Sequence, residues 1–190
     1  MPTPEVFLYD AGKADAYYNF PDYVILGLIG LESYMDYYDD VAFVGAHWEE
    51  FTRAMTWLVN NQGSNGLIDL AKYQVVFLGT GAGMASGAGD WESANAWIEV
   101  AGNVKTAINE LLWNDTLGNY ALDVSTPEVY GVSATAFALT SGVANETQVK
   151  LIVDALEGLL QGPGYLDSSD TDNTTHISPN TNGFLLDALL

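Results

Sequence analysis

Residues 89–115 read GDWESANAWIEVAGNVKTAINELLWND, and this stretch is the strongest indicator of the fold. Its apolar residues recur at intervals of three and four, which is typical of one face of an α-helix. Asp90 directly precedes the stripe and is expected to cap the first turn of the helix. The apolar stripe consists of Trp91, Ala94, Ile98, Ala101, Val104, Ile108, Leu111 and Leu112.

Similar helical patterns lie on both sides of this stretch. Residues 20–40, FPDYVILGLIGLESYMDYYDD, place Pro21 at the first helical position, where proline is favoured. The spacing of Trp48, Phe51, Met55 and Leu58 indicates a further helix, and residues 131–140 indicate another. An Asn145–Gln148 capping box precedes the stripe Val149, Ile152, Val153, Leu156 and Leu160. Ser178-Pro179 marks the start of the last helix. Extended structure is expected only as short pieces at residues 67–70 and 117–123. The sequence therefore predicts an all-α domain of about six helices that pair through short loops.

Composition limits the partners of this domain. Of its 190 residues, 48% are hydrophobic and 16% charged, so the chain has enough apolar surface to fold. Five basic residues face 25 acidic ones, which gives a net charge of −20. A nucleic acid or an anionic membrane requires clustered Lys and Arg, and the five basic residues are scattered. We expect neither partner.

Metal and cofactor chemistry has little support in the sequence. The chain contains no cysteine, and His47 and His176 lie far apart without acidic neighbours at ligand spacing. Residues 73–87, YQVVFLGTGAGMASG, look like a strand that enters a glycine loop, but they fit the dinucleotide-binding pattern only loosely. We expect no cofactor and no metal, and we expect residues 83–90 to form a glycine-rich connection.

In this order, the segments resemble glycoside hydrolase family 78, the α-L-rhamnosidases, in its fungal branch. The resemblance runs from about Phe7 to Leu190 and is strongest over residues 89–115 and the following LGNYALD, residues 117–123. It implies an (α/α)6 six-hairpin barrel that cleaves terminal α-L-rhamnose with inversion, using two carboxylates and no obligatory metal. About six helices correspond to part of such a barrel.

The resemblance also suggests which residues contact a sugar. Asp10 and Asp15, in LYDAGKADAYYN, could correspond to the loop of the family's catalytic acid; the alternative is a linker that leads into the first helix. Asp22 and Tyr23 lie at the start of one helix and Asn180 and Asn182 at the start of the last, where the family's inner helices face the sugar pocket. The alternative roles of Asp22, Asn180 and Asn182 are a favourable interaction with the helix dipole and helix capping.

Several expectations concern the protein as a whole. The last helix has no glycine stop and no basic last turn, so we expect the 1–190 domain to continue beyond Leu190. The sequons at Asn114, Asn145 and Asn173 favour a secreted glycoprotein. The expected partner is a rhamnose-containing carbohydrate. The alternative to an enzyme is a non-catalytic carbohydrate-binding or self-assembling helical protein.

Overall fold

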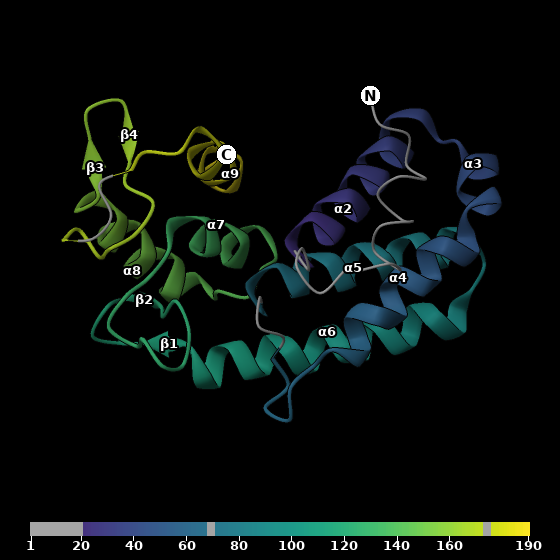
Figure 1. Cartoon of the computed structure of the whole chain (residues 1–190), viewed down its shortest axis with the longest axis horizontal. Coiled ribbons are helices and arrows are strands. Elements are labelled where there is room, and N and C mark those ends of the chain that lie inside the picture. The colour runs from purple at the N-terminus through teal and green to yellow at the C-terminus, as the bar shows by residue number, and fades with distance from the viewer. Residues whose placement is uncertain (1–20, 68–70, 173–175) are drawn as a thin grey trace. The chain divides into compact units, whose positions relative to one another are not determined.

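The computed structural model describes residues 21–67, 71–172 and 176–190, and these residues are mostly helical (Figure 1). The chain forms two compact units, Met1–Val104 and Lys105–Leu190. The long helix α6 (Trp91–Leu111) contributes residues to both units. The prediction of an all-α architecture is confirmed.

The first unit contains helices α2 (Pro21–Tyr38), α3 (Val41–Ala46), α4 (Trp48–Asn60) and α5 (Ala71–Gly87), followed by most of α6. Pro21 occupies the first position of α2, as predicted. Helix α2 packs against α5. Helix α4 buries one apolar face, formed by Phe51, Ala54, Met55 and Leu58, and leaves its polar face in solvent.

Helix α5 corrects two predictions. Residues 73–78 resemble a strand in sequence and residues 83–90 were expected to form a glycine-rich connection, but a single helix covers Ala71–Gly87. Leu78, Ala82 and Ala85 are buried at helical spacing, and this burial outweighs the strand propensity of the preceding Val-Val-Phe run. The helix ends where Gly89 takes a φ of +80°. The Gly89 and Asp90 N–H groups donate to the Ser86 and Ala85 carbonyls, which is the Schellman arrangement.

Helix α6 begins as predicted, because the Asp90 carboxylate accepts a hydrogen bond from the Ser93 N–H at 3.1 Å. Its buried face differs from the predicted stripe. Ile98 is 57% exposed, whereas the neighbouring Trp97 is only 6% exposed and packs edge-on against Phe51, with 5.9 Å between the ring centroids. The predicted stripe is therefore wrong at Trp91, Ile98 and Leu111, of which Trp91 and Leu111 are 63% and 42% exposed. At Ile98, the contact with α4 selects Trp97 instead.

The second unit contains the end of α6, the helices α7 (Val132–Thr140), α8 (Glu146–Glu157) and α9 (Pro179–Leu189), and two short hairpins. The hairpins pair β1 (Trp113–Asn114) with β2 (Asn119–Tyr120) and β3 (Leu160–Gln161) with β4 (Gly164–Tyr165), both antiparallel. Helix α7 packs on α9, and the core includes Tyr120, Ile152 and Leu185. The predicted extended piece at 117–123 is thus present as β2.

Two helix starts in this unit confirm their predicted caps. The Asn145 side chain accepts from the Gln148 N–H, and the Gln148 side chain accepts from the Asn145 N–H, which completes the capping box of α8. Ser178 caps α9, and Pro179 follows it. Helix α8 is shorter than predicted: it ends at Glu157, so Leu160 lies in β3, and Val153 is exposed. The described residues form eight helices rather than about six, because α3 and α5 were not recognised in the sequence.

Candidate functional site

The predicted catalytic pair, Asp10 and Asp15, lies outside the residues that the structure describes. Asp22 and Tyr23 occupy the second and third positions of α2, as expected for residues at a helix start. The backbone position agrees with the prediction, while the proposed contact of these side chains with a sugar stays a prediction.

Asn180 and Asn182 lie in the first turn of α9. Asn180 is exposed, but the Asn182 amide binds the backbone of β4. Asn182 Oδ1 accepts from the Tyr165 N–H at 2.7 Å, and Nδ2 donates to the Tyr165 and Ser178 carbonyls at 2.9 and 3.0 Å. Asn182 therefore joins α9 to the β3–β4 hairpin. A sugar hydroxyl that bound its amide would have to share or replace these bonds.

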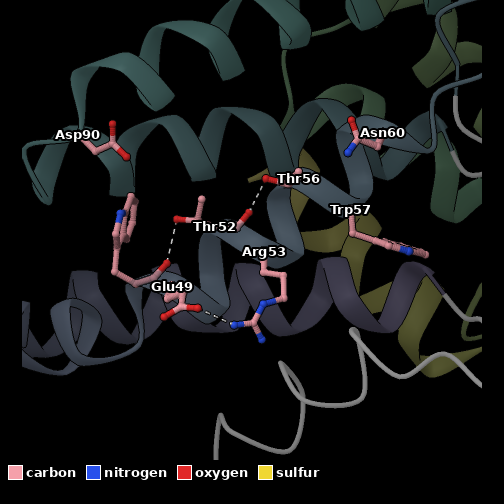
Figure 2. Close-up of a pocket in the computed structure, with 8 residues that line it drawn as sticks. Glu49, Thr52, Arg53, Thr56, Trp57, Asn60 and Asp90 are labelled. Atoms are coloured by element: carbon pink, nitrogen blue, oxygen red, sulfur yellow. Dashed lines mark hydrogen bonds and ion pairs between the residues drawn. The ribbon is translucent and has the colours of Figure 1, made fainter.

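An open groove of about 670 Å³ lies on the first unit, along the solvent-facing side of α4. Figure 2 shows Asp90 at one end of the groove and Trp57 with Asn60 at the other. The groove is lined by Trp48, Glu49, Thr52, Arg53, Thr56, Trp57, Asn60 and Asp90. Two tryptophan rings and a set of polar groups therefore face one depression.

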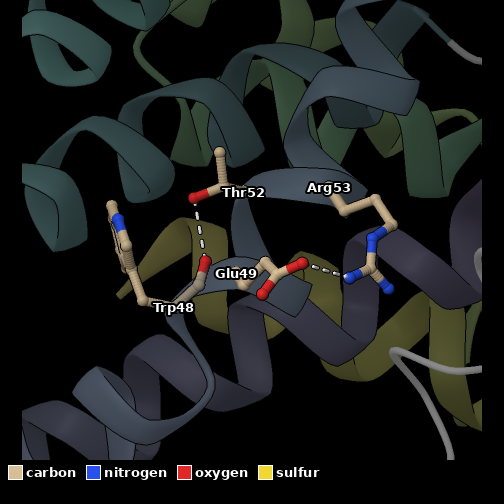
Figure 3. A network of polar contacts seen from close by, with 4 residues as sticks. All are labelled: Trp48, Glu49, Thr52 and Arg53. Carbon is tan, nitrogen blue, oxygen red and sulfur yellow. Dashed lines mark hydrogen bonds and ion pairs between the residues drawn. The ribbon is translucent and has the colours of Figure 1, made fainter.

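Local contacts fix the floor of this groove. Thr52 Oγ1 donates to the Trp48 carbonyl and Thr56 Oγ1 to the Thr52 carbonyl, both at 2.8 Å. Arg53 and Glu49 form an ion pair at 3.1 Å between consecutive turns of α4 (Figure 3). Both charged side chains are well exposed, at 59% and 87%, so the pair contributes little to stability. The opposite charges of Arg53 and Glu49 cancel, so together they add no net charge to the groove floor.

Ring stacking and hydrogen bonds hold the end of the groove near Asp90. Trp48 stacks on Phe51 with 5.2 Å between ring centroids and an interplanar angle of 25°. Hydrogen bonds from the Ser93 backbone and side chain hold the pKa of the Asp90 carboxyl below its ordinary value, and the Trp48 indole adds a smaller lowering. Asp90 is therefore an ionised acceptor at neutral pH, and the stacked ring of Trp48 lies beside it.

The groove was not predicted from the sequence. Trp48 was assigned to the buried stripe of α4, but it is only half-buried, and Trp57 was not singled out. The polar residues Glu49, Thr52, Arg53, Thr56 and Asn60 fall on one side of a helical projection and mark the solvent face of the helix. Two tryptophans at the borders of such a polar stripe were the available signal.

A partly buried polar network in the second unit centres on Asn109. Its Oδ1 accepts from the Tyr120 hydroxyl and from Gln148 Nε2, both at 3.0 Å, while Nδ2 donates to the Lys105 and Val143 carbonyls. These bonds connect α6, β2 and the start of α8. Because every polar atom of the Asn109 amide is bonded within the protein, we interpret the network as structural.

The described residues offer neither a metal site nor a membrane-spanning helix. Within the described ranges, no group of three or more His, Cys, Asp or Glu side chains is placed to hold a metal ion. The His47 ring instead packs against Phe43, with 4.6 Å between centroids. In the same part of the chain, no helix is long and apolar enough to cross a membrane.

The architecture matches solved structures of rhamnosidases. The glycoside hydrolase family 78 rhamnosidase of Bacillus sp. GL1 superimposes with a TM-score of 0.69 at 19% sequence identity, over 90% of this chain and 20% of that one. A rhamnosidase from Klebsiella oxytoca with rhamnose bound gives a TM-score of 0.71 at 16% identity, over 90% of this chain and 34% of that one. The chain has a rhamnosidase-like helical fold.

This rhamnosidase-like fold is all-α and forms part of the six-hairpin class. The chain spans between about a fifth and a third of the length of the two rhamnosidases. No family model matches the sequence, and no curated protein matches it. The likeness to these enzymes is thus one of fold, at 16–19% sequence identity.

Proposed function

We propose that the chain is part of the catalytic domain of a glycoside hydrolase that cleaves terminal α-L-rhamnosides with inversion. The observation that carries the proposal is the rhamnosidase-like fold, which extends over 90% of the chain in both comparisons. One of the two similar proteins is described with rhamnose bound, so a carbohydrate is the partner that this fold suggests. Assignment to the fungal branch rests on the sequence resemblance alone.

The reaction requires two carboxyl groups with different protonation states. One must stay protonated to donate to the leaving oxygen, and the other must be ionised to activate a water. An inverting enzyme keeps the two roughly 6.5–9.5 Å apart so that the water fits between the base and the sugar. We assign the catalytic loop to Asp10 and Asp15 and the sugar contacts to Asp22, Tyr23, Asn180 and Asn182.

The 190-residue chain alone is expected to be inactive. It spans at most 34% of the length of the compared rhamnosidases, and an incomplete ring of helices leaves a sugar pocket open to water. Water in the pocket weakens every electrostatic contact there. Purified chain should release no phenol from an aryl α-L-rhamnoside. Turnover by a monomeric chain that Asp15→Asn abolishes would refute this expectation and would support Asp10 and Asp15 as catalytic.

Self-assembly is the second candidate, in which the chain is a non-catalytic helical protein. Leu186, Leu189 and Leu190 of the last helix and its end are 62%, 47% and 97% exposed, and apolar side chains that gather on a surface favour association. Sedimentation velocity at several concentrations measures this directly. Association without rhamnoside turnover would favour the second candidate, and a concentration-independent monomer would count against it.

Secretion is part of the proposal. Among the three sequons, Asn145 is exposed at the start of α8, and its Oδ1 caps the helix. Asn114 is less open, because its Nδ2 donates to the Pro127 carbonyl at 2.8 Å, and Asn173 lies outside the described residues. We expect a glycan at Asn145 in protein from a eukaryotic native host. Peptide mapping that finds all three asparagines unmodified would argue against secretion.

A further inference from the structure

We infer that the α4 groove is a binding site for a neutral saccharide, separate from the residues assigned to catalysis and to sugar contact at the helix starts. The groove comprises Trp48, Glu49, Thr52, Arg53, Thr56, Trp57, Asn60 and Asp90. It lies within the first unit, so its geometry does not depend on the second. The inference holds whether or not the chain belongs to an active rhamnosidase.

The two tryptophans are spaced for a short chain of sugar rings. Trp48 and Trp57 are nine residues apart on α4, which corresponds to about two and a half turns and a rise of about 13 Å. The half-turn places them on opposite flanks of the exposed helix face, and both are half-buried. Each ring can therefore pack against the C–H surface of a sugar. The separation exceeds the length of a disaccharide, so a disaccharide would contact one ring at a time, and only a longer oligosaccharide would contact both.

Along its length, the groove offers both kinds of hydrogen-bonding group that sugar hydroxyls need. The carboxylates of Glu49 and Asp90 accept, whereas the Arg53 guanidinium has five N–H donors, of which the ion pair to Glu49 uses one at 3.1 Å. The Asn60 amide can do both, and it is exposed. The Thr52 and Thr56 hydroxyls already donate to backbone carbonyls, so they are left to act as acceptors.

Charge favours a neutral occupant over a charged one. The groove contains one arginine, already paired with Glu49, and the additional carboxylate Asp90. An anionic ligand would meet that carboxylate and a protein with a net charge of −20. A basic peptide would be attracted by the overall negative charge. The groove itself, however, presents only one carboxylate that is not in an ion pair, Asp90. The affinity of such a peptide would therefore come from long-range attraction and would disappear in salt.

The experiment is an NMR titration of the whole 190-residue chain, read at the indole N–H signals of its five tryptophans. The probes are the neutral disaccharides rutinose and cellobiose, the anionic digalacturonate, and a tetralysine peptide. We expect a neutral disaccharide to shift the Trp48 and Trp57 signals in moderate salt, each through its own end of the groove, and to leave Trp91 and Trp113 unchanged. Digalacturonate should bind more weakly than the neutral disaccharides.

Variants test whether the groove itself binds. Trp57→Ala should weaken disaccharide binding about tenfold, equivalent to about 1.4 kcal/mol. The matched control is Trp91→Ala, which removes a 63% exposed tryptophan of α6 that does not line the groove and should leave binding unchanged. Asn60→Ala provides a second groove variant that removes no ring and should weaken binding. Circular dichroism confirms that each variant is folded.

Three results would overturn the inference. These are the absence of indole shifts with every neutral disaccharide, binding of tetralysine in moderate salt in preference to sugars, or equal disaccharide affinity of Trp57→Ala and the parent chain. None of these readings involves hydrolysis, so a failure here is distinguishable from a failure of the rhamnosidase proposal. Conversely, a chain that hydrolyses no rhamnoside but binds a disaccharide through Trp57 would support the groove as a binding site.

Discussion

Asp123 shows how one side chain can stabilise a loop through its charge. Its Oδ1 accepts from the Ser125 N–H at 2.7 Å and from the Ser125 hydroxyl at 2.5 Å, and the Thr126 N–H donates to it at 3.0 Å. The Thr126 hydroxyl donates to Oδ2 at 2.8 Å. These bonds, led by that of the Ser125 hydroxyl, lower the pKa of Asp123 to about 2.

This lowered pKa predicts a pH dependence of stability. The ordinary pKa of Asp is about 3.9, so the folded form holds the proton less tightly than the unfolded form. The stabilisation is therefore fully present above about pH 4 and is lost as the pH falls towards 2. We expect the difference in unfolding free energy between the parent chain and Asp123→Asn to shrink over this window, as measured by denaturant unfolding.

The matched measurement is an NMR titration of the Asp123 carboxyl carbon. Ser125→Ala should raise its pKa towards the ordinary value, because it removes the principal hydrogen bond, whereas Ser133→Ala on α7 should leave it unchanged. An unchanged Asp123 titration in Ser125→Ala would show that the hydroxyl is not the cause.

At the scale of elements, the glycines of α5 differ in what surrounds them. A Cβ added to Gly81 would collide with Sδ and Cε of Met55, whereas one added to Gly79 or Gly83 would meet nothing within 4 Å. Met55 is fully buried on α4, so it has little space into which to move. Gly81 therefore permits the close approach of α5 and α4, and the other two glycines are not required for packing.

Substitution by alanine separates these roles. Gly79→Ala and Gly83→Ala should each stabilise the protein by up to about 1 kcal/mol, because alanine has the higher helix propensity and both sites are exposed. Gly81→Ala should instead destabilise it by about 1–3 kcal/mol through overpacking. Thermal unfolding of the three variants provides the comparison. A Gly81→Ala variant as stable as the other two would show that Met55 yields at little cost.

At the scale of the whole molecule, the net charge of −20 opposes folding. Like charges repel more strongly in the compact state, and salt shortens the range of this repulsion from about 10 Å at 0.1 M to about 3 Å at 1 M. We therefore expect the melting temperature to rise by several degrees when NaCl is raised from low concentration to near 1 M. Sucrose at equal osmolarity controls for general solute effects. A melting temperature that stays constant or falls with NaCl would contradict this expectation.

Much of the architecture follows from the sequence alone, because it depends on local features. The starts of α2, α6, α8 and α9 are encoded by Pro21, Asp90, Asn145 and Ser178, which satisfy or replace backbone N–H groups within one turn of their own position. Periodic apolar residues then predict helices, and the family resemblance predicts their class. These signals require no knowledge of the partner elements.

Tertiary structure decided the features that depend on contacts distant in sequence. Strand propensity at residues 75–77 favoured an extended segment, yet packing against α2 makes α5 a helix. The choice between Trp97 and Ile98 as the buried residue of α6 depends on where Phe51 of α4 lies. The groove likewise exists only because the fold brings Asp90 to the exposed face of α4. Asp90 is 30 or more positions away from the other groove residues, and local sequence patterns do not specify which distant residues pack together.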